Sequence, residues 1–420
     1  MKATIAHLSP LLVGATLLTL GNGLFNIALS LRLNAFGHSV TAAGLVLGAY
    51  FLGFIPATLT APKVIARVGH IRGFAAFAAI AAAAILAMPI VTSQPLPVWA
   101  ALRGVIGYCL AALFMIIESW INARTENRAR GRVVGLYQAL IFVAVALAQL
   151  LVGFGDVTGF VLFSVVAMFY ALSLVPIALT RAEPPTLAAP SRAGLGRLLA
   201  VSPLAVAMAF GAGLINNAYV NLGPVFATEI GMDLHTVGRF MAIGMLSGLV
   251  LQWPLGWLSD HIDRRRVLLF ISFGAAVASL GLAIAAANAP AAVFAFAAAF
   301  AGLSFAQYPQ AVAHANDYAA HEERVAVSAG LLLTYGLGAI LAPTVAGAAM
   351  DMFGPTALFG YTAVMSAALG GFCLYRMGRR TAKPLGEQAP FAPVPATTPV
   401  AAQLDPRAEP ADAGPAADRS

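Results

Sequence analysis

Residues 256–266 read Gly-Trp-Leu-Ser-Asp-His-Ile-Asp-Arg-Arg-Arg, a short polar turn between two apolar runs that are each long enough to cross a bilayer. A weaker copy of the turn lies 194 residues earlier, at an offset that places Asp260 on Ala66 and Arg266 on Arg72. The copy is again a basic turn between long apolar runs. A loop that is repeated in this setting predicts a membrane protein built by duplication of one half.

The composition places the chain in a lipid bilayer. Of its 420 residues, 60% are hydrophobic and 10% are charged, and the mean hydropathy is +0.85, whereas soluble proteins carry about 25% charged residues. Apolar runs of membrane-spanning length start near residues 10, 41, 72, 97, 131, 157, 199, 234, 266, 290, 324 and 355. Runs of this length are typical of helices and too long for barrel strands. We therefore predict an all-α membrane protein with twelve transmembrane helices.

The positive charges predict the orientation. With a cytoplasmic N-terminus, twelve helices place all but three of the 24 lysines and arginines on the inner side, the exceptions being Arg32, Arg103 and Arg239. Because cytoplasmic loops are rich in these residues, both termini are predicted to be cytoplasmic in a multi-pass protein of the cell inner membrane. The net charge of +7 thus follows from topology and does not indicate a nucleic-acid partner.

The chain divides into two halves and a tail. Residues 1–180 and 199–378 are predicted as six-helix halves, joined by a cytoplasmic linker at 181–198 that is rich in proline and charge. Residues 379–420 lack apolar periodicity and are predicted to be a disordered cytoplasmic tail. The same offset also aligns Asn22 with Asn216, Gly44 with Gly238 and Asn122 with Asn316. Because six is an even number, the halves form two parallel pseudo-repeats.

The two turns resemble the loop signature of the major facilitator superfamily, roughly Gly-x-x-x-Asp-Arg-x-Gly-x-Arg-Arg. The second copy matches it at Gly256, Asp260, Arg265 and Arg266. The first copy keeps Arg67, Gly69 and Arg72 but has Pro62 and Ala66 in place of the family's glycine and aspartate. The resemblance covers residues 10–377 and implies two six-helix halves that rock about a central cavity and carry a small molecule by alternating access.

A narrower resemblance is carried by Glu118-Ser119-Trp120 at the end of the fourth predicted helix, which is similar to a little-studied bacterial branch of the superfamily. The fifth predicted helix reads Leu147-Ala148-Gln149 where many drug exporters have Gly-Pro. This departure argues against a multidrug antiporter of the usual kind.

Arg103 is the first candidate for substrate binding. It lies about one turn into the fourth predicted helix, where a buried arginine is costly and usually faces protein or water. It would hold an anionic substrate group or act on a proton-carrying carboxylate. Alternatively, it extends to the interface beside Trp99.

Other cavity candidates follow from the resemblance, which implies that helices 1, 4, 7 and 10 line the cavity. Asn22 and Asn26 share one face of the first helix. The remaining candidates are Asn216, Asn217, Tyr219, Gln307 and Tyr308. Amides of this kind also stabilise contacts between packed membrane helices, so both roles stay open.

The gate candidates lie near the inner ends of the helices. Glu118 is predicted to pair with Arg67 or Arg72, either as a structural gate or as a titrating proton carrier. Asp260 is predicted to hold facing helix ends together with Arg264, Arg265 and Arg266, although these residues could also be ordinary inner-side cations.

Motifs for enzymatic chemistry are absent from the sequence. No phosphate-binding Gly-x-x-x-x-Gly-Lys-Ser/Thr loop, His-Glu-x-x-His motif or cysteine metal motif occurs, so we expect neither an enzyme nor a cofactor nor a metal site. The predicted function is proton-coupled secondary transport of a small organic molecule by a monomer, with export favoured. The alternatives are an uptake symporter or uniporter for a small, possibly anionic, metabolite and a transport-dead membrane sensor or assembly factor.

Overall fold

A computed structural model describes residues 2–91, 95–179, 193–388, 390–393 and 395–405. Within these residues, twelve helices are long and apolar enough to cross a membrane, as the sequence predicted. The first six are α1 (Lys2–Ala35), α2 (Val40–Val68), α3 (His70–Ile90), α4 (Leu96–Arg124), α5 (Asn127–Leu151) and α6 (Val161–Ala178). The second six are α8 (Pro203–Glu229), α9 (Leu234–His261), α10 (Arg264–Asn288), α11 (Pro290–Tyr318), α12 (Arg324–Phe353) and α13 (Ala357–Met377).

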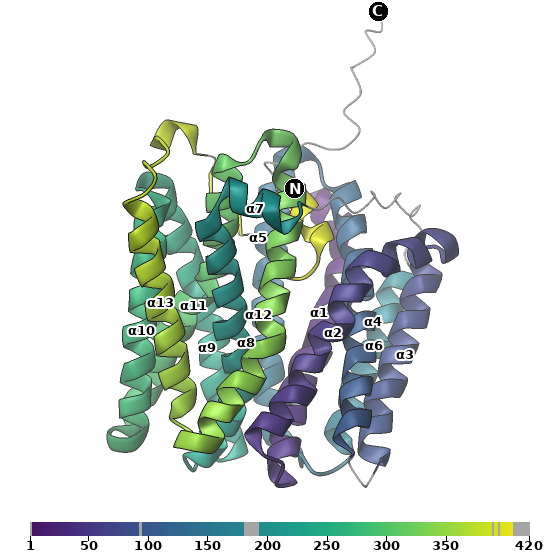
Figure 1. The fold of residues 1–420 in the computed structure, drawn as a ribbon. Helices are drawn as coiled ribbons and strands as arrows, with labels where there is room; N and C mark the ends of the chain where they lie inside the picture. The colour runs from purple at the N-terminus through teal and green to yellow at the C-terminus, as the bar shows by residue number, and fades with distance from the viewer. Residues whose placement is uncertain (1, 92–94, 180–192, 389, 394, 406–420) are drawn as a thin grey trace, which may run out of the picture.

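The helices form one bundle of two halves, with α3, α4 and α6 toward one side and α10, α11 and α13 toward the other (Figure 1). The ends of the bundle differ. We call the end that carries the N-terminus and the described residues after α13 the terminal face, and the end that carries the α1–α2 and α8–α9 turns the opposite face.

The 194-residue repeat is visible in the helix boundaries. Gly37 and Gly231 both have positive φ, at 76° and 92°, in the turns before α2 and α9. The next helices begin at equivalent caps, because Ser39 accepts a hydrogen bond from the N–H of Ala42 and Asp233 accepts one from Thr236. The turn chemistry has therefore been kept in both halves, which explains why one offset aligns them.

Two related contacts join the halves near the opposite face. A Cβ added to Gly44 in α2 would lie 2.3 Å from the carbonyl oxygen of Pro343 in α12. At the equivalent position in α9, a Cβ added to Gly238 would lie 2.7 Å from the carbonyl oxygen of Gln149 in α5. Glycine is required at both places because the helix backbones approach too closely for a side chain.

Polar contacts also join the two halves at the opposite face. Asp351 near the end of α12 accepts hydrogen bonds from the backbone N–H of Val40 at 2.9 Å and from the hydroxyl of Thr41 at 2.6 Å. Ser30 in α1 donates to the carbonyl oxygen of Asn221 in α8. The two halves are therefore in direct contact at the opposite face.

The region after α13 differs from the predicted disordered tail. Residues 379–388, 390–393 and 395–405 fold back onto the terminal face and include two short 3-10 helices, η3 (Leu385–Glu387) and η4 (Pro399–Leu404). Ala401 and Leu404 are fully buried. The segment is ordered by docking onto the bundle and not by a core of its own, so its composition gave no sign of structure. Residues 406–420 of the predicted tail lie outside the described residues.

The predicted linker also holds a structured part. Its residues 181–192 lie outside the described residues, but the short helix α7 (Leu195–Val201) crosses the predicted boundary at 198. Just before it, the backbone N–H of Ala193 donates to the carbonyl oxygen of Ala326 at 3.1 Å. The second half therefore begins with a helix that precedes its first membrane span.

Candidate functional site

Arg103 lies inside the bundle with only 2% of its surface exposed. Its Nη2 donates to Oδ1 of Asn26 at 2.5 Å, and its Cζ lies 5.0 Å from the ring centroid of Phe25 and 4.9 Å from that of Tyr50. Trp99 is also buried, so the alternative of an arginine reaching the interface beside that tryptophan is wrong. The two aromatic faces stabilise the guanidinium without neutralising its charge.

The guanidinium is only partly satisfied. Its Nε and Nη1 are buried and have no hydrogen-bond partner among the described residues, where none of the ion pairs involves Arg103. A buried arginine without a counter-charge is costly. The guanidinium therefore keeps unused hydrogen-bond donors inside the bundle.

The two asparagines of α1 lie on the face that turns toward the second half. Asn22, Asn26 and Ser30 follow one another at intervals of four residues, and Ser30 contacts α8 directly. Oδ1 of Asn22 is buried without a partner among the described residues.

A second polar group lies in α8, α11 and α12. Asn217 donates from Nδ2 to the hydroxyl of Tyr335 at 3.0 Å, and the ring of Tyr335 lies 5.1 Å from that of Tyr308. Asn216 is buried, with no hydrogen-bond partner for its Oδ1 in the described chain. Gln307 is fully buried, and neither of its amide atoms has a partner there.

Aromatic residues connect the two groups across the interface between the halves. The rings of Phe51 in α2 and Tyr335 in α12 have centroids 6.5 Å apart, and Phe51 stacks edge-on against Tyr50 at 4.9 Å. Tyr50 is close enough to interact electrostatically with both Arg103 and Tyr335. The structure therefore brings Arg103 and Asn26 toward the second polar group. Sequence analysis missed Tyr50 and Tyr335, whose only signal is a tyrosine in the middle of a span.

Tyr219 does not join this group. Its ring packs among those of Phe240, Phe300, Phe305 and Phe359, at centroid distances of 5.5 to 6.4 Å. Its hydroxyl points at Gly244, where an added Cβ would lie 2.1 Å away. Two residues after Asn217 the helix has turned by about 200°, so Tyr219 faces the core of the second half instead of the interface.

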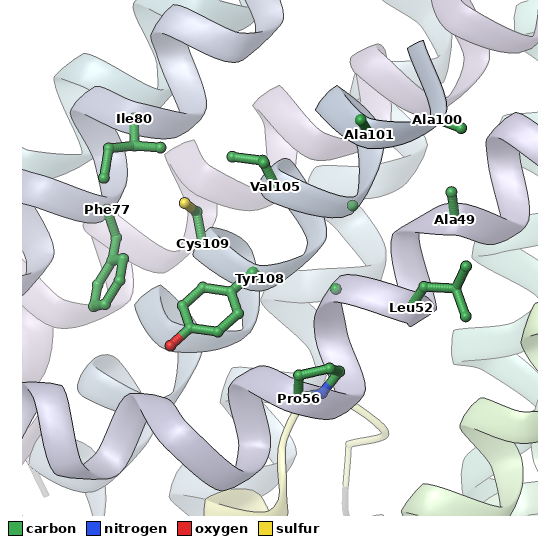
Figure 2. Close-up of a pocket in the computed structure, with 12 residues that line it drawn as sticks. Ala49, Leu52, Pro56, Phe77, Ile80, Ala100, Ala101, Val105, Tyr108 and Cys109 are labelled. Carbon is green, nitrogen blue, oxygen red and sulfur yellow. The ribbon is translucent and has the colours of Figure 1, made fainter. Parts of the chain in front are cut away.

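A large groove on the side of the first half is a separate feature (Figure 2). It measures about 610 Å³ and is lined mainly by apolar side chains of α2, α3 and α4, with Tyr108 among them. Leu52, Ile80 and Val105 in its wall are each more than 40% exposed. Its apolar, outward-facing wall suits lipid chains, and it is not the polar cavity between the halves that the resemblance implies.

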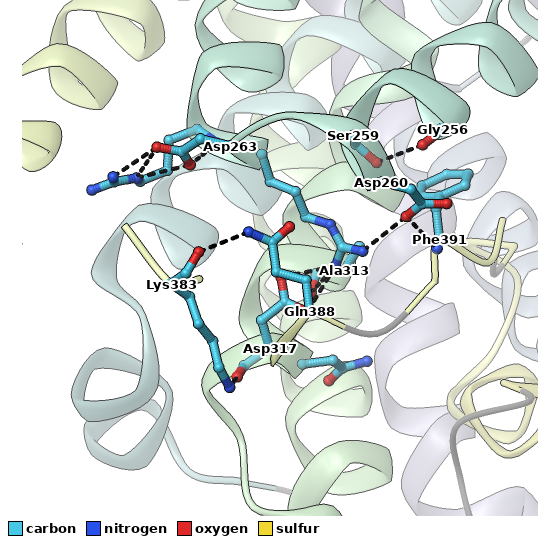
Figure 3. A network of polar contacts seen from close by, with 12 residues as sticks. Gly256, Ser259, Asp260, Asp263, Ala313, Asp317, Lys383, Gln388 and Phe391 are labelled. Atoms are coloured by element: carbon cyan, nitrogen blue, oxygen red, sulfur yellow. Dashed lines mark hydrogen bonds and ion pairs between the residues drawn. The ribbon is translucent and has the colours of Figure 1, made fainter. Parts of the chain in front are cut away.

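The repeated turn in the second half forms a buried ion pair (Figure 3). Arg264 is 1% exposed and donates from Nη1 to both carboxylate oxygens of Asp317 at 2.8 Å, and to the carbonyl oxygen of Ala313 at 3.1 Å. Its Nη2 donates to Asp260 at 3.2 Å. Asp260 also accepts the backbone N–H of Phe391 at 2.8 Å. These contacts of Asp260 are with its own half and with the C-terminal segment.

The remaining gate arginines have separate roles. Arg265 pairs with Asp263 at 2.7 Å and donates to the carbonyl oxygen of Arg380 at 2.6 Å. Burial raises the pKa of Asp263, but the hydrogen bonds from Arg265 outweigh it and leave the pKa below its usual value. Arg266 is exposed and borders a lateral groove on α10. Arg265 therefore ties the end of α13 to the turn.

The predicted pairing of Glu118 with Arg67 or Arg72 is wrong. Both arginines are exposed at the surface, whereas Glu118 is fully buried and accepts hydrogen bonds from the hydroxyls of Tyr137, Thr397 and Thr398. The rotation of α4 turns Glu118 toward the middle of the bundle, so the carboxylate cannot meet the surface turn.

At the turn of the first half, a histidine makes the contact that was predicted for Glu118 and an arginine. His70 starts α3, is 4% exposed, and shares a hydrogen bond of 3.1 Å with the hydroxyl of Ser119 in α4. The 194-residue offset places His70 on Arg264 and Ser119 on Ala313. In both halves, the first residue of the helix after the turn is therefore bound to the next helix. The contact is the His70–Ser119 hydrogen bond in the first half and the Arg264–Asp317 ion pair in the second.

Comparisons with known proteins agree with this architecture. A sequence model described as Major Facilitator Superfamily matches residues 11–307. The chain is 30% identical over 356 residues to the uncharacterized MFS-type transporter YcaD of Escherichia coli (strain K12 / DH10B), covering 83% of this chain and 90% of that protein. The YcaD protein of Salmonella newport (strain SL254) is 28% identical over 354 residues, with the same coverage.

Two solved structures share the fold. A mutant form of the nucleoside transporter NupG superposes with a TM-score of 0.74 at 14% identity, covering 88% of this chain and 99% of that chain. A bacterial homolog of the human lysosomal transporter Spinster gives a TM-score of 0.70 at 17% identity, covering 91% and 97%. With twelve spans in two related halves and a family match over most of its length, the chain belongs to the major facilitator superfamily.

Proposed function

We propose that this superfamily transporter carries a small organic molecule with an anionic group, which binds between the halves at Arg103. The observation that carries the proposal is the buried guanidinium with two unpartnered nitrogens and no ion pair among the described residues. Asn22, Asn26 and the Asn217–Tyr335 pair would supply hydrogen bonds to the rest of the molecule. A planar guanidinium with free donors suits a carboxylate or a phosphate.

The chain would work as a monomer in the cell inner membrane, with the terminal face toward the cytoplasm. This orientation is supported by the positive-inside rule and by the exposed arginines at the α2–α3 turn. Alternating access then means that the direct contacts at the opposite face close the outer side, and that rocking of the halves opens it.

Proton coupling is the proposed energy source, with Glu118 as its candidate group. Its carboxylate is fully buried and hydrogen-bonded to hydroxyl groups and to the backbone at Ala401, and no ion pair within the described residues includes it. A buried carboxylate in such surroundings can exchange between charged and neutral forms. Export remains the favoured direction, and uptake of an anionic metabolite is the second candidate because Arg103 favours negative charge.

Substrate accumulation in everted membrane vesicles tests the direction and the coupling. A screen of small organic acids and phosphate esters should find at least one compound that accumulates in the vesicles when their interior is more acidic than the medium. Collapsing the gradient should abolish this accumulation. Accumulation that survives the collapse would contradict proton coupling, and facilitated entry down the compound's own gradient would favour the uniporter.

Arg103→Gln tests the anion site. Because glutamine keeps donors but loses the charge, the apparent affinity for the identified acid should fall about tenfold or more, which corresponds to about 1.4 kcal/mol. The matched control is Arg239→Gln, since Arg239 is exposed near the opposite face. Equal affinities for Arg103→Gln and the wild type would remove Arg103 from the binding site.

A further inference from the structure

The C-terminal segment lies between helices of the two halves. The contacts between α2 and α12 include Thr41–Asp351 at the opposite face and Ile55, whose side chain would lie 3.5 Å from a Cβ added to Gly336. Farther toward the terminal face, η4 packs against α4, α5 and α12. A segment from the end of the chain therefore occupies the space between helices of both halves.

The first half binds this segment through α4. Thr397 and Thr398 each donate a hydroxyl hydrogen bond to the carboxylate of Glu118, one to each oxygen. One turn later in α4, Asn122 donates from Nδ2 to the side-chain oxygen of Gln403 at 3.3 Å. Both oxygens of this buried carboxylate would be costly to leave without hydrogen bonds, so the threonine pair is the main polar anchor.

The second half binds the same segment through α9 and α11. Asn316 donates from Nδ2 to the carboxylate of Asp405 at 3.4 Å. The ring of Phe391 lies over Gly256, where an added Cβ would be 2.3 Å from it, and its backbone N–H is held by Asp260. The glycine and the aspartate of the repeated turn are thus both in contact with the chain's own C-terminal segment (Figure 3).

The 194-residue repeat relates the two asparagines that bind this segment. Asn122 and Asn316 are equivalent positions at that offset, and they bind Gln403 and Asp405, two residues apart at the end of one short helix. A pair of related asparagines, one from each half, therefore holds η4 from two sides. A cavity of about 300 Å³ lies between α5 and α9, and Phe391 and Pro393 form part of its wall.

We propose that the described residues 390–393 and 395–405 form a plug that closes the terminal face of the transporter and holds its halves together there. Helix–helix contacts close the opposite face, so a plugged chain is closed at both ends. The plug must leave before the site at Arg103 can open to the cytoplasm, which makes its release a control point for the cycle. This inference rests on the proposed function for its consequence, but its geometry can be tested without a substrate.

Thiol labelling of a buried reporter tests the plug. Ser328 in α12 is 4% exposed and bonds to Asn316, directly beside Asp405. Ser328→Cys changes one atom, and the native Cys109 and Cys373 are buried. In the full-length protein, purified in detergent, a membrane-impermeant maleimide should label this cysteine slowly. A chain that ends at Gln388 should be labelled at least tenfold faster.

Two further variants separate plug release from unfolding. Thr397→Val with Thr398→Val keeps the side-chain shapes but removes both donors to Glu118, and it should also raise the labelling rate. Thr381→Val is the control, because Thr381 is exposed in the stretch between α13 and the plug, and it should leave the rate unchanged. A variant is folded if its thermal unfolding midpoint is that of the parent protein. Labelling of the two native cysteines, measured without the Ser328→Cys reporter, should also be unchanged.

The outcomes are distinct. If neither the truncation nor the threonine pair raises the labelling rate in folded protein, the plug is overturned, whether or not transport is found. If the rates rise as expected while no organic acid or phosphate ester is transported, the plug stands and the proposed function fails.

Discussion

Gly53→Ala should destabilise the protein by about 3 kcal/mol, a cost at the upper end of that for overpacking a well-packed core. A Cβ at this position in α2 would lie 1.7 Å from the carbonyl oxygen of Gly104 in α4 and 3.0 Å from the backbone nitrogen of Tyr108. Both obstacles are backbone atoms, so rotation of a side chain cannot relieve the clash. The two helices would have to separate over their contact.

The matched control lies on the other side of the same crossing. At Gly104 an added Cβ would meet its nearest neighbour, the carbonyl oxygen of Ala49, at 3.5 Å, which is ordinary van der Waals contact. Because alanine favours helix over glycine by about 1 kcal/mol, Gly104→Ala should be neutral or slightly stabilising. Unfolding titrations with SDS in mixed micelles measure both variants. Equal losses of stability would refute this account of the crossing.

Arg264→Met should cost about 3–5 kcal/mol, because it leaves the carboxylate of Asp317 buried without its partner. The side chains of Arg264 and Asp317 are 1% and 2% exposed, and the two oxygens of the carboxylate both lie 2.8 Å from Nη1. Asp317→Leu should also be destabilising, since the buried guanidinium then loses its closer carboxylate and keeps the 3.2 Å contact with Asp260. The double variant Arg264→Met with Asp317→Leu should recover most of the loss.

An exposed ion pair provides the comparison. Arg197 and Glu323 lie 2.5 Å apart, closer than the buried pair, but their side chains are 52% and 36% exposed. Solvent screens such a pair, so Glu323→Gln should leave the unfolding midpoint nearly unchanged. The same titrations decide the matter. For the buried pair, the contrary result is a double variant of Arg264 and Asp317 that is no more stable than either single variant. Packing at these two positions, and not charge pairing, would then determine the stability.

The length of the hydrophobic runs was sufficient to predict the helices. Twelve apolar runs gave twelve spans, and the family match confirmed the resemblance read from Gly256, Asp260, Arg265 and Arg266. The same offset also relates Gly37 to Gly231, which have the same positive-φ conformation in equivalent turns. These features are local in sequence, and local chemistry determines them.

The rotation of each helix about its axis could not be predicted. Glu118 and Tyr219 were assigned to a gate and a cavity, but a helix turns by about 100° per residue, and the partner helices decide which side is inside. For the same reason, Gly53 and Gly104 are indistinguishable in sequence although one of them allows no side chain. The docking of residues 395–405 could not be foreseen either, because it depends on contacts with distant helices, made by Glu118, Asn122 and Asn316.

The paired glycine contacts between the halves bear on how this protein arose. Gly44 packs on Pro343 and Gly238 packs on Gln149. Each half therefore contributes one glycine and one residue on which the other half's glycine packs, and the two halves use equivalent positions for both. A six-helix unit with both features is self-complementary, and two copies related by a twofold axis would form the same interface twice. The present molecule therefore has the contact surfaces of a symmetric homodimer, which is the arrangement that duplication and fusion of one six-helix unit would produce.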